Sequence, residues 1–354
     1  MDLFREVLQR GIDHLHDASS KRHALTVLAV VEKASGSPVS SAIRRQAVQY
    51  AGDVLGSRRF APWLLVYSAM AGEFREGWIP DAFFGRVVSP RVNHGIRHVS
   101  SVKTFTRVVF DSGAIPDNAY LIDGRLFDRD FRLLSAGRAH EAVFGDSDQV
   151  VVKSDGSRQG KGVRRLSRDQ FDADSLEQQD GNAVFQRVIS HHPFFARYSA
   201  GFSTTMRITT VKNLSGAIEA RAAYLRFARD GEDFVRSASH VRLAIDVASG
   251  RTAPVGYLSD WSMAKCHPDS LVQFEHASVP AFGAARELCI TLHSRLPHVG
   301  VIGWDVMVDA EEHVWVIEWN AKHADIKFSE ATVGPCFTGL GWERLRPPKR
   351  SWLT

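Results

Sequence analysis

The sequence predicts an α+β protein in which a helical N-terminal region precedes a larger part built from antiparallel strands. Apolar residues recur at helical spacing over about the first eighty residues. From about residue 118 onward, short strand-like runs alternate with turn dipeptides, and residues 282–296 return to helical spacing. Strands paired in hairpins, with helices between them, are typical of α+β architecture with antiparallel sheets.

The N-terminal region is expected to form several helices. Its apolar residues recur about every fourth position, in the sets Leu3, Val7 and Leu8, then Leu25, Leu28 and Val31, then Ile43, Val48 and Leu55. Turn-forming residues at 36–38 and 57–59 are expected to separate these helices. Neither a Rossmann-type strand nor a phosphate loop opens the chain.

Three turn dipeptides predict hairpins in the second part of the chain. They are Asp123-Gly124, Ser215-Gly216 and Ser249-Gly250, and each lies between two apolar runs. The flanking runs are 120–122 and 126–127, 206–211 and 218–224, and 241–247 and 252–257. The two runs of each pair are therefore expected to form adjacent antiparallel strands.

Residues 150–163, VVVKSDGSRQGKGV, predict a strand followed by a glycine-rich loop that could hold phosphate. The glycines are Gly156, Gly160 and Gly162. Glycines let backbone N–H groups approach phosphate oxygens closely, and Lys153 and Lys161 add positive charge. The loop is not a P-loop motif, because its spacing and the residue after Lys161 differ from that motif. Taken alone, the segment fits a solvent-exposed basic hairpin loop equally well.

The segment GVIGWDVMVDAEEHVWVIEWN, residues 300–320, predicts two strands, at 301–308 and 314–319. Alternate residues of a strand share a face, so Glu318 and Asn320 project to the same side. If Asp309 pairs with Glu312 across a tight turn, Asp305 lies opposite Val316 and diagonal to Glu318, on that same face.

Asp305, Glu318 and Asn320 would then bring three oxygen ligands together. Two carboxylates and an amide carbonyl are hard donors of the kind that magnesium prefers. The alternative is a surface hairpin whose polar face meets water, and spacing alone favours that alternative. The tryptophans of this hairpin are expected to bury its other side; they are Trp304, Trp315 and Trp319.

The composition is that of a soluble globular protein. The 354 residues suggest two or three packed units, with 44% hydrophobic and 24% charged residues. The net charge of +4 favours an anionic partner such as a nucleotide, but no Lys/Arg run indicates a nucleic-acid-binding arm. The three cysteines have neither metal nor disulfide spacing. Without a signal peptide or an apolar run that could cross a bilayer, a cytoplasmic protein is expected.

Taken in order, these segments resemble the ATP-grasp superfamily. The order is a lysine-ended strand, a glycine-rich loop, the strand VFQRVI at 184–189 and a closing D…E-x-N hairpin. More narrowly, SVKTF around Lys103, QRVISHHP from Gln186, STTMRITTV around Arg207, and VIGWDVMV with VIEWN are similar to the sugar-transfer-associated ATP-grasp group. The resemblance covers residues 80 to 325, approximately.

The resemblance implies an ATP-grasp fold, in which two α+β subdomains with antiparallel sheets grip ATP. Residues 1–88 would form the helical N-terminal region. Residues 89–190 would form the small subdomain with a glycine-rich flap, and residues 191–354 the large subdomain with the metal and substrate site.

The resemblance also implies roles for individual residues. Lys103 and Lys153 would contact the ATP phosphates. The flap over them would contain Gly156, Ser157, Gly160, Lys161 and Gly162. The adenine pocket would be lined by Gln186, Arg187, Val188 and Ile189. One or two magnesium ions would be held by Asp305, Glu318 and Asn320.

Arginines on two successive predicted strands are candidates for transition-state stabilisation, because a guanidinium binds carboxylate or phosphoryl oxygens in a bidentate manner. Arg207 is expected to be the catalytic arginine and Arg221 its weaker companion. Arg226 is expected to face solvent.

Three positions depart from the family pattern. Hinge segments of ATP-grasp proteins often carry a carboxylate for the ribose, whereas Gln186 and Arg187 precede two histidines here, so the ribose contact is unassigned. Residues 236–240 stand where a Gly-Gly element is expected on the acceptor side. After Asn320, the residues Lys322, His323 and Asp325 either shape the substrate pocket or cap the sheet.

The resemblance therefore implies an ATP- and magnesium-dependent ligase that forms an amide through an acyl phosphate. Its substrates would be a small-molecule or saccharide-linked carboxylic acid and an amine. A sugar acid joined to an amine and an amino-acid or peptide ligation are both open. The alternatives are a kinase of this fold that phosphorylates a hydroxyl or sugar, and a non-catalytic polyanion-binding module.

Overall fold

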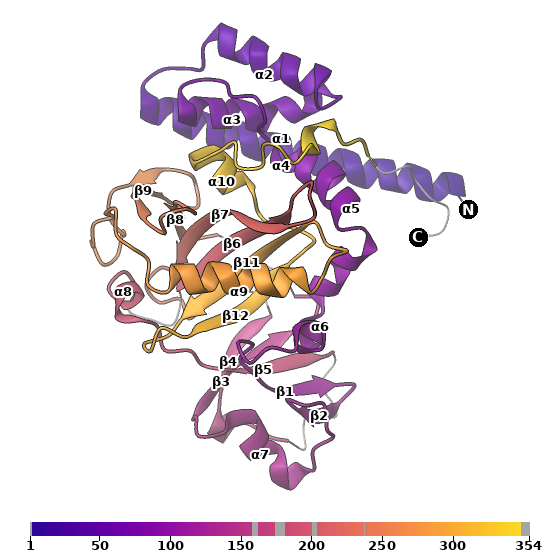
Figure 1. Ribbon diagram of the computed structural model, residues 1–354, viewed down its shortest axis with the longest axis vertical. Coiled ribbons are helices and arrows are strands. Elements are labelled where there is room, and N and C mark those ends of the chain that lie inside the picture. The colour runs from indigo at the N-terminus through magenta and orange to yellow at the C-terminus, as the bar shows by residue number, and fades with distance from the viewer. Residues whose placement is uncertain (1, 158–161, 174–180, 200–203, 237, 348–354) are drawn as a thin grey trace.

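The computed structural model describes residues 2–157, 162–173, 181–199, 204–236 and 238–347, with side chains from residue 17 onward. Helices form one end of the molecule, a seven-stranded sheet lies in the middle, and a five-stranded sheet lies at the other end (Figure 1). The predicted α+β class with antiparallel sheets is confirmed, since every paired strand of both sheets runs antiparallel to its neighbour.

The N-terminal region contains three long helices, as the apolar spacing predicts. They are α1 (Asp2–Ser35), α2 (Ser41–Asp53) and α3 (Ala61–Ala71). The first break lies at Gly36, whose φ of 73° is left-handed and so favours glycine. Short helices then lead to the first sheet: α4 (Asp81–Phe83), α5 (Ser89–Val92) and α6 (Thr106–Phe110).

The five-stranded sheet has the order β2-β1-β5-β3-β4. Its strands are β1 (Asp117–Ile122), β2 (Arg125–Asp128), β3 (Gln149–Ser154), β4 (Val163–Ser167) and β5 (Ala183–Arg187). Helix α7 (Ala136–Phe144) covers one face, where Val150, Val152 and Phe185 contribute to a compact core. The Asp123-Gly124 hairpin is confirmed, with Ile122 opposite Arg125. Strand β5 ends at Arg187, two residues earlier than predicted.

The seven-stranded sheet has the order β10-β9-β8-β7-β6-β11-β12. Its strands are β6 (Thr204–Lys212), β7 (Ile218–Phe227), β8 (Val241–Ile245), β9 (Thr252–Tyr257), β10 (Met263–Ala264), β11 (Val301–Val308) and β12 (Val314–Asn320). The β6–β7 and β8–β9 hairpins confirm the two Ser-Gly turns. The remaining helices are α8 (Pro193–Ala196), α9 (Phe282–Ser294) and α10 (Lys327–Thr332).

The two faces of this larger sheet have different partners. Helix α9 packs on one face, in a core that contains Ile208, Leu225 and Trp304. On the opposite face, Ala222 and Tyr224 join the core formed with α10 and the N-terminal helices. Gly303 also lies on this opposite face, where a Cβ atom would come within 2.8 Å of the Ala324 carbonyl oxygen. Glycine therefore lets the segment before α10 lie directly on the sheet.

Candidate active site

The closing hairpin places Asp305 directly opposite Glu318, and Gly303 opposite Asn320. The predicted pairing of Asp305 with Val316 is wrong, because Val316 pairs with Val306 and is buried on the other face. Two single-residue shifts account for the difference. The turn brings Asp309 opposite His313, where the Asp309 N–H donates to the His313 carbonyl at 3.0 Å. Farther along β12 the register shifts between Asp305 and Val306, so Ile317 is an extra residue in a β-bulge.

Asp305 is held by two arginines from the neighbouring strands. Arg207 lies opposite it on β6 and donates from Nε to Oδ1 at 2.6 Å and from Nη2 to Oδ2 at 3.0 Å. Arg226 on β7 reaches the same Oδ1 at 2.6 Å. Burial pushes the pKa of Asp305 upward, but Arg207 and Arg226 hold it below its ordinary value. Asp305 is therefore a buried charged group whose negative charge is compensated by two guanidinium groups.

The assignment of Arg226 to solvent is therefore wrong. Its side chain is only 14% exposed and belongs to the buried Asp305 cluster. The structure does not bring Arg221 to this cluster, because its guanidinium pairs with Glu219 at 2.6 Å and donates to the Thr338 carbonyl. Arg221 is the extra residue of a β-bulge between Ala220 and Ala222, and it lies three residues along β7 from Tyr224, which pairs with Arg207.

Lys153 connects the two sheets at this point. It lies on β3, is 7% exposed, and donates from Nζ to the Ile317 carbonyl at 3.1 Å. Ile317 is the bulge residue of β12, which is the edge strand of the larger sheet, so its carbonyl is available to a group outside the strand ladder. Burial lowers the pKa of Lys153 to about 8, and Glu318 opposes part of that shift. Lys153 is thus balanced between its neutral and its charged form, and the charged form is well suited to bind an anion.

Lys103 is the second buried lysine of this region. Its Nζ donates to the Ser157 carbonyl at 3.0 Å and contacts the Ser157 hydroxyl at 3.2 Å, so it reaches the start of the glycine-rich loop. Asp155 anchors the same loop, because its carboxylate accepts from the Thr104 N–H at 3.0 Å and the Thr104 hydroxyl at 2.7 Å.

Two glycines of this loop, Gly156 and Gly162, lie where a side chain would be unfavourable. Gly156 has a φ of 68° and donates its N–H to the Ser101 carbonyl at 3.0 Å. A Cβ on Gly162 would come within 2.4 Å of the Ser157 side chain. Gly160 and Lys161 lie outside the described residues.

The predicted adenine-pocket segment begins on β5. Gln186 is buried, and its Nε2 donates to Asp117 at 2.7 Å. Arg187 lies over the Trp315 ring at 5.1 Å, so it joins β5 to the closing hairpin. Val188 is half-buried and Ile189 is buried.

Asp117 was not identified from the sequence. Its other oxygen accepts from the Tyr120 hydroxyl at 2.9 Å, and burial raises its pKa. It lies opposite Gln186 in the β1–β5 pair. No spacing pattern in the sequence indicates this residue, since it precedes an apolar strand as many turn aspartates do.

Glu318 and Asn320 offer oxygen atoms without protein partners. No described residue forms a hydrogen bond or ion pair with the Glu318 carboxylate. The Asn320 amide nitrogen is buried and also has no partner there. Asp305 Oδ2 accepts one hydrogen bond and keeps a second lone pair. This donor set, two carboxylates and an amide, fits magnesium.

Asp325 lies on the same face of the sheet. Its Oδ2 accepts from the Tyr224 hydroxyl at 2.8 Å, and Tyr224 lies opposite Arg207 in the β6–β7 pair. Burial opposes ionisation of Asp325, but Lys327 and Arg207 hold its pKa well below the usual range. Asp325 therefore lies close to Arg207 of the Asp305 cluster.

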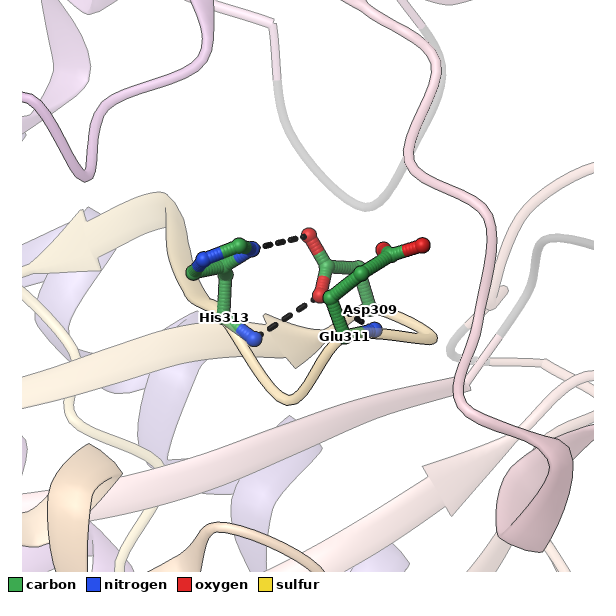
Figure 2. Close-up of side chains that lie close together, drawn as sticks. All are labelled: Asp309, Glu311 and His313. Carbon is green, nitrogen blue, oxygen red and sulfur yellow. Dashed lines mark hydrogen bonds and ion pairs between the residues drawn. The ribbon is translucent and has the colours of Figure 1, made fainter.

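A second group of possible metal ligands lies in the turn between β11 and β12 (Figure 2). It consists of Asp309, Glu311 and His313, whose ligand atoms lie within 4.8 Å of one another. Asp309 Oδ1 already accepts from the Glu311 N–H at 3.1 Å and the His313 N–H at 2.8 Å. Its Oδ2 accepts from Trp315 at 2.8 Å. These bonds shape the turn, so we interpret the group as structural.

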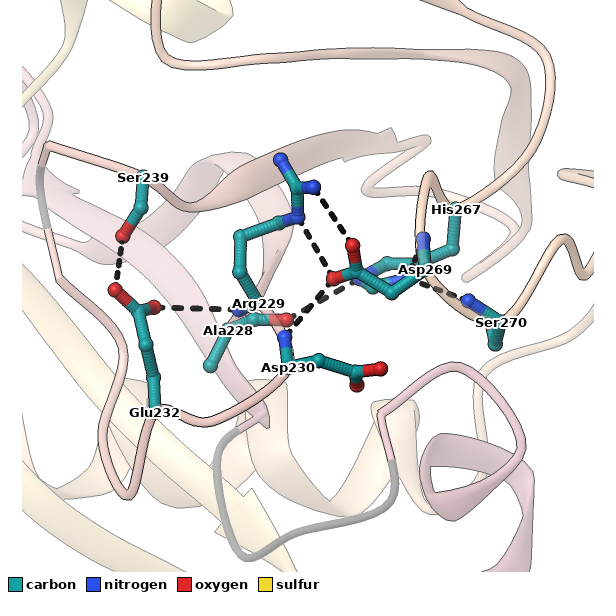
Figure 3. Close-up of polar contacts among 8 residues, drawn as sticks. All are labelled: Ala228, Arg229, Asp230, Glu232, Ser239, His267, Asp269 and Ser270. Carbon is teal, nitrogen blue, oxygen red and sulfur yellow. Dashed lines mark hydrogen bonds and ion pairs between the residues drawn. The ribbon is translucent and has the colours of Figure 1, made fainter.

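A polar cluster fastens the loop that leaves β7 (Figure 3). Arg229 binds Asp269 in a bidentate pair at 2.7 and 2.6 Å. Asp269 also accepts from the Asp230 N–H at 2.9 Å, and Glu232 accepts from the Ser239 hydroxyl at 2.5 Å. These contacts hold the segment that leads from β7 to β8.

Within the described residues, none of the helices is both long enough and apolar enough to span a bilayer. A family model for sugar-transfer-associated ATP-grasp proteins matches residues 135–339. None of the curated proteins matches the sequence.

Among solved structures, the chain is similar to the ATP-grasp ligase PsnB complexed with a minimal precursor, at 15% identity and a TM-score of 0.39 over 69% of this chain and 60% of PsnB. It is similar to D-alanine–D-alanine ligase from Coxiella burnetii, at 14% identity and a TM-score of 0.40 over 70% of this chain and 56% of that ligase. For biotin carboxylase from Campylobacter jejuni, the values are 12% identity and a TM-score of 0.45 over 92% and 70%. The chain thus spans less than two thirds of the first two proteins.

Proposed function

Because the chain belongs to the sugar-transfer-associated ATP-grasp family, we propose that it uses ATP and magnesium to join a carboxylic acid to an amine. One observation carries the proposal. The buried Asp305–Arg207–Arg226 cluster lies beside Lys153 and the unpartnered carboxylate of Glu318, where the two sheets meet. Such a set of fixed positive charges and metal-type oxygens suits phosphoryl transfer.

Nucleotide contacts are proposed for the smaller sheet and its loop. Lys103 and Lys153 would bind phosphate oxygens, and binding would replace their present contacts to backbone carbonyls. The glycine-rich loop, residues 156–162, would supply N–H groups to the phosphates. Residues 186–189 would cover the adenine, with the backbone reading the base edge.

Magnesium would be held by Asp305, Glu318 and Asn320. When bound, it would neutralise charge on the transferring phosphoryl group. The structural support is the donor set itself, in which Glu318 and Asn320 have no partner among the described residues. Arg207 and Arg226 keep Asp305 ionised and in place.

The proposed chemistry has two steps. A carboxylate oxygen of the acid attacks the γ-phosphorus of ATP, the bond to the β-phosphate oxygen breaks, and ADP leaves with the electron pair. The amine nitrogen then attacks the acyl carbon, phosphate leaves, and the nitrogen proton passes to the departing phosphate. Arg207 and Arg226 would stabilise charge on the carboxylate and the transferring group, which arginine does through bidentate contacts.

The test is a screen for phosphate release from ATP across carboxylic acids and amines, including sugar acids, amino acids and peptides, with mass spectrometry of the products. An amide formed in step with ADP and phosphate supports the ligase. A stable phosphorylated hydroxyl compound without amide contradicts the ligase and supports a kinase. Failure to bind Mg–ADP in a calorimetric titration contradicts any ATP-dependent activity.

A further inference from the structure

Arg242 on β8 is a buried guanidinium without an ion pair. It is 4% exposed, and no carboxylate of the described residues lies within ion-pair distance of it. Nη2 donates to the Leu258 carbonyl at 3.0 Å, while the buried Nε has no hydrogen-bond partner. Buried polar groups almost always have partners, so this donor requires an explanation.

The aromatic rings around Arg242 do not supply that partner. Its guanidinium carbon lies 4.3 Å from the Trp261 ring centre and 4.8 Å from the Phe328 ring centre. Stacking of this kind stabilises the cation through the faces of the rings. The N–H groups point outward in the plane of the guanidinium, and they need acceptors of their own.

His240, two residues before Arg242, is a second buried group, and its ring lies close to the backbone of Arg236. It is 7% exposed, and its Nδ1 has no hydrogen bond among the described residues. Burial, together with Arg242 and Arg226, lowers the pKa of His240 to about 3. The ring is therefore neutral and can donate one hydrogen bond without adding charge.

The pair lies next to the Asp305 cluster. Arg242 is directly opposite Arg226 in the β7–β8 pair, and Arg226 binds Asp305. The acid that most influences Arg242 is Asp325, which already accepts from Tyr224 and lies 4.0 Å from Lys327. Positive charge thus exceeds negative charge on the β8 side of the cluster.

We propose that His240 and Arg242, beside Arg226, form a subsite for an oxyanion carried by the substrate, either a carboxylate or a phosphate. The subsite rests on the proposed function, which places the reacting carboxylate at Arg207 and Arg226. An oxyanion at Arg242 would accept from the free Nε and pair with the uncompensated charge, and the neutral imidazole would donate to the same group. One end of the substrate would be held while the other reacts.

The experiment measures oxyanion binding to the full chain while a non-hydrolysable ATP analogue and magnesium saturate the nucleotide site. Acetate and methyl phosphate are titrated at constant ionic strength, with uncharged methyl acetate as the blank, and binding is followed by calorimetry. Variants are Arg242→Met and His240→Leu. The matched control is Arg197→Met, which removes an arginine stacked on Phe194 and Tyr198 at the surface.

The wild type and Arg197→Met are expected to bind acetate, methyl phosphate or both, and the preferred probe identifies the oxyanion. Arg242→Met and His240→Leu are expected to bind it about tenfold or more weakly, the loss typical of a hydrogen bond to a charged group. If Arg242→Met does not fold, judged by circular dichroism, His240→Leu decides.

Absence of oxyanion binding in the wild type, or unchanged affinity in a folded Arg242→Met or His240→Leu, would overturn the subsite. A purely structural role gives another signature, a lower urea midpoint with unchanged oxyanion affinity. Binding of the ATP analogue is recorded first in each titration. If the wild type does not bind it, the proposed function fails; if it binds but the oxyanion result is negative, only the subsite fails.

Discussion

Asp305 satisfies opposing demands through its immediate neighbours. A carboxylate that is 4% exposed would ordinarily take up a proton, but Arg207 and Arg226 keep its pKa low. One of its oxygens receives two guanidinium contacts and the other receives one. The residue can therefore orient both arginines and still offer a lone pair to a metal.

Glu318→Gln tests the metal proposal at a residue whose side chain has no described partner. We expect magnesium-dependent ADP formation to fall about a hundredfold, because the substitution removes one of the two negative charges that face the cation. The urea midpoint should hardly change, since no native contact is lost. Glu311→Gln, in the exposed turn, is the control and should keep full activity. Equal activity of the two variants would contradict the assignment.

Arg226→Met tests the corrected arginine assignment. Removing this guanidinium leaves Asp305 with one of its two arginine partners. We expect turnover to fall more than tenfold further than in Arg221→Met, since a charge-assisted contact at a reacting group is worth several kcal/mol. Steady-state rates of both variants provide the measurement. A greater loss in Arg221→Met would restore the assignment made from sequence.

At the scale of elements, helix α9 is fixed to the large sheet by a buried hydrogen-bond chain. The Trp304 indole donates to the Thr210 hydroxyl at 2.8 Å, and Thr210 contacts His293 Nδ1 at 2.7 Å. His293 Nε2 meets the Val299 carbonyl at 2.9 Å. A neutral imidazole satisfies both partners when Nε2 carries the hydrogen and Nδ1 accepts.

This chain of hydrogen bonds predicts that the protein loses stability in acid. Burial lowers the pKa of His293 to about 4 from an ordinary value of 6.5. As pH falls from 6.5 toward 4, His293 therefore takes up a proton in the unfolded protein but stays neutral in the folded protein. The unfolding free energy should drop by up to about 1.4 kcal/mol per pH unit from this residue. Urea unfolding across that range should show a smaller slope for His293→Gln.

The exposed His298→Gln serves as the control for that series and should keep the wild-type slope. Both substitutions remove one titratable imidazole and differ in burial. If the slope of His293→Gln equals that of the wild type, the buried chain does not govern the acid response.

The limits of prediction from sequence are clearest in the strands. Strands 301–308 and 314–320 follow from alternation and turn residues, because both signals are local. The Ile317 bulge does not, since an extra residue leaves no mark in an apolar run. The position of Arg226 depends on β6 lying between β7 and β11. That order is set by packing between distant segments, and no local pattern of the sequence reports it.

At the scale of the whole molecule, Glu330 links the N-terminal helices to the sheets. It is fully buried on α10, and its carboxylate accepts from the Ile79 N–H and the Cys336 N–H, each at 2.7 Å. Its own carbonyl accepts from the Trp78 indole at 3.0 Å. The sequence offered no indication of this link, because Trp78 and Ile79 lie about 250 residues away from Glu330.

Glu330→Ala is expected to destabilise the whole chain. It leaves one buried and one partly buried N–H group without an acceptor, a loss of roughly 3 kcal/mol in unfolding free energy. Urea unfolding followed by tryptophan fluorescence provides the measurement. Glu73→Ala, at a site with a 64% exposed side chain, is the control and should leave the midpoint unchanged. An unaltered midpoint in Glu330→Ala would show that this link does not support the fold.

The bulge at Ile317 also has a consequence for the evolution and the engineering of this protein. Deleting that single codon would leave Val316 against Val306 and Glu318 against Asp305, with every side chain of the hairpin on its present face. The lost component would be the carbonyl that receives Lys153. The Lys153 contact between the two sheets could thus be gained or lost by a one-residue insertion or deletion, while Asp305, Glu318 and Asn320 stay in place.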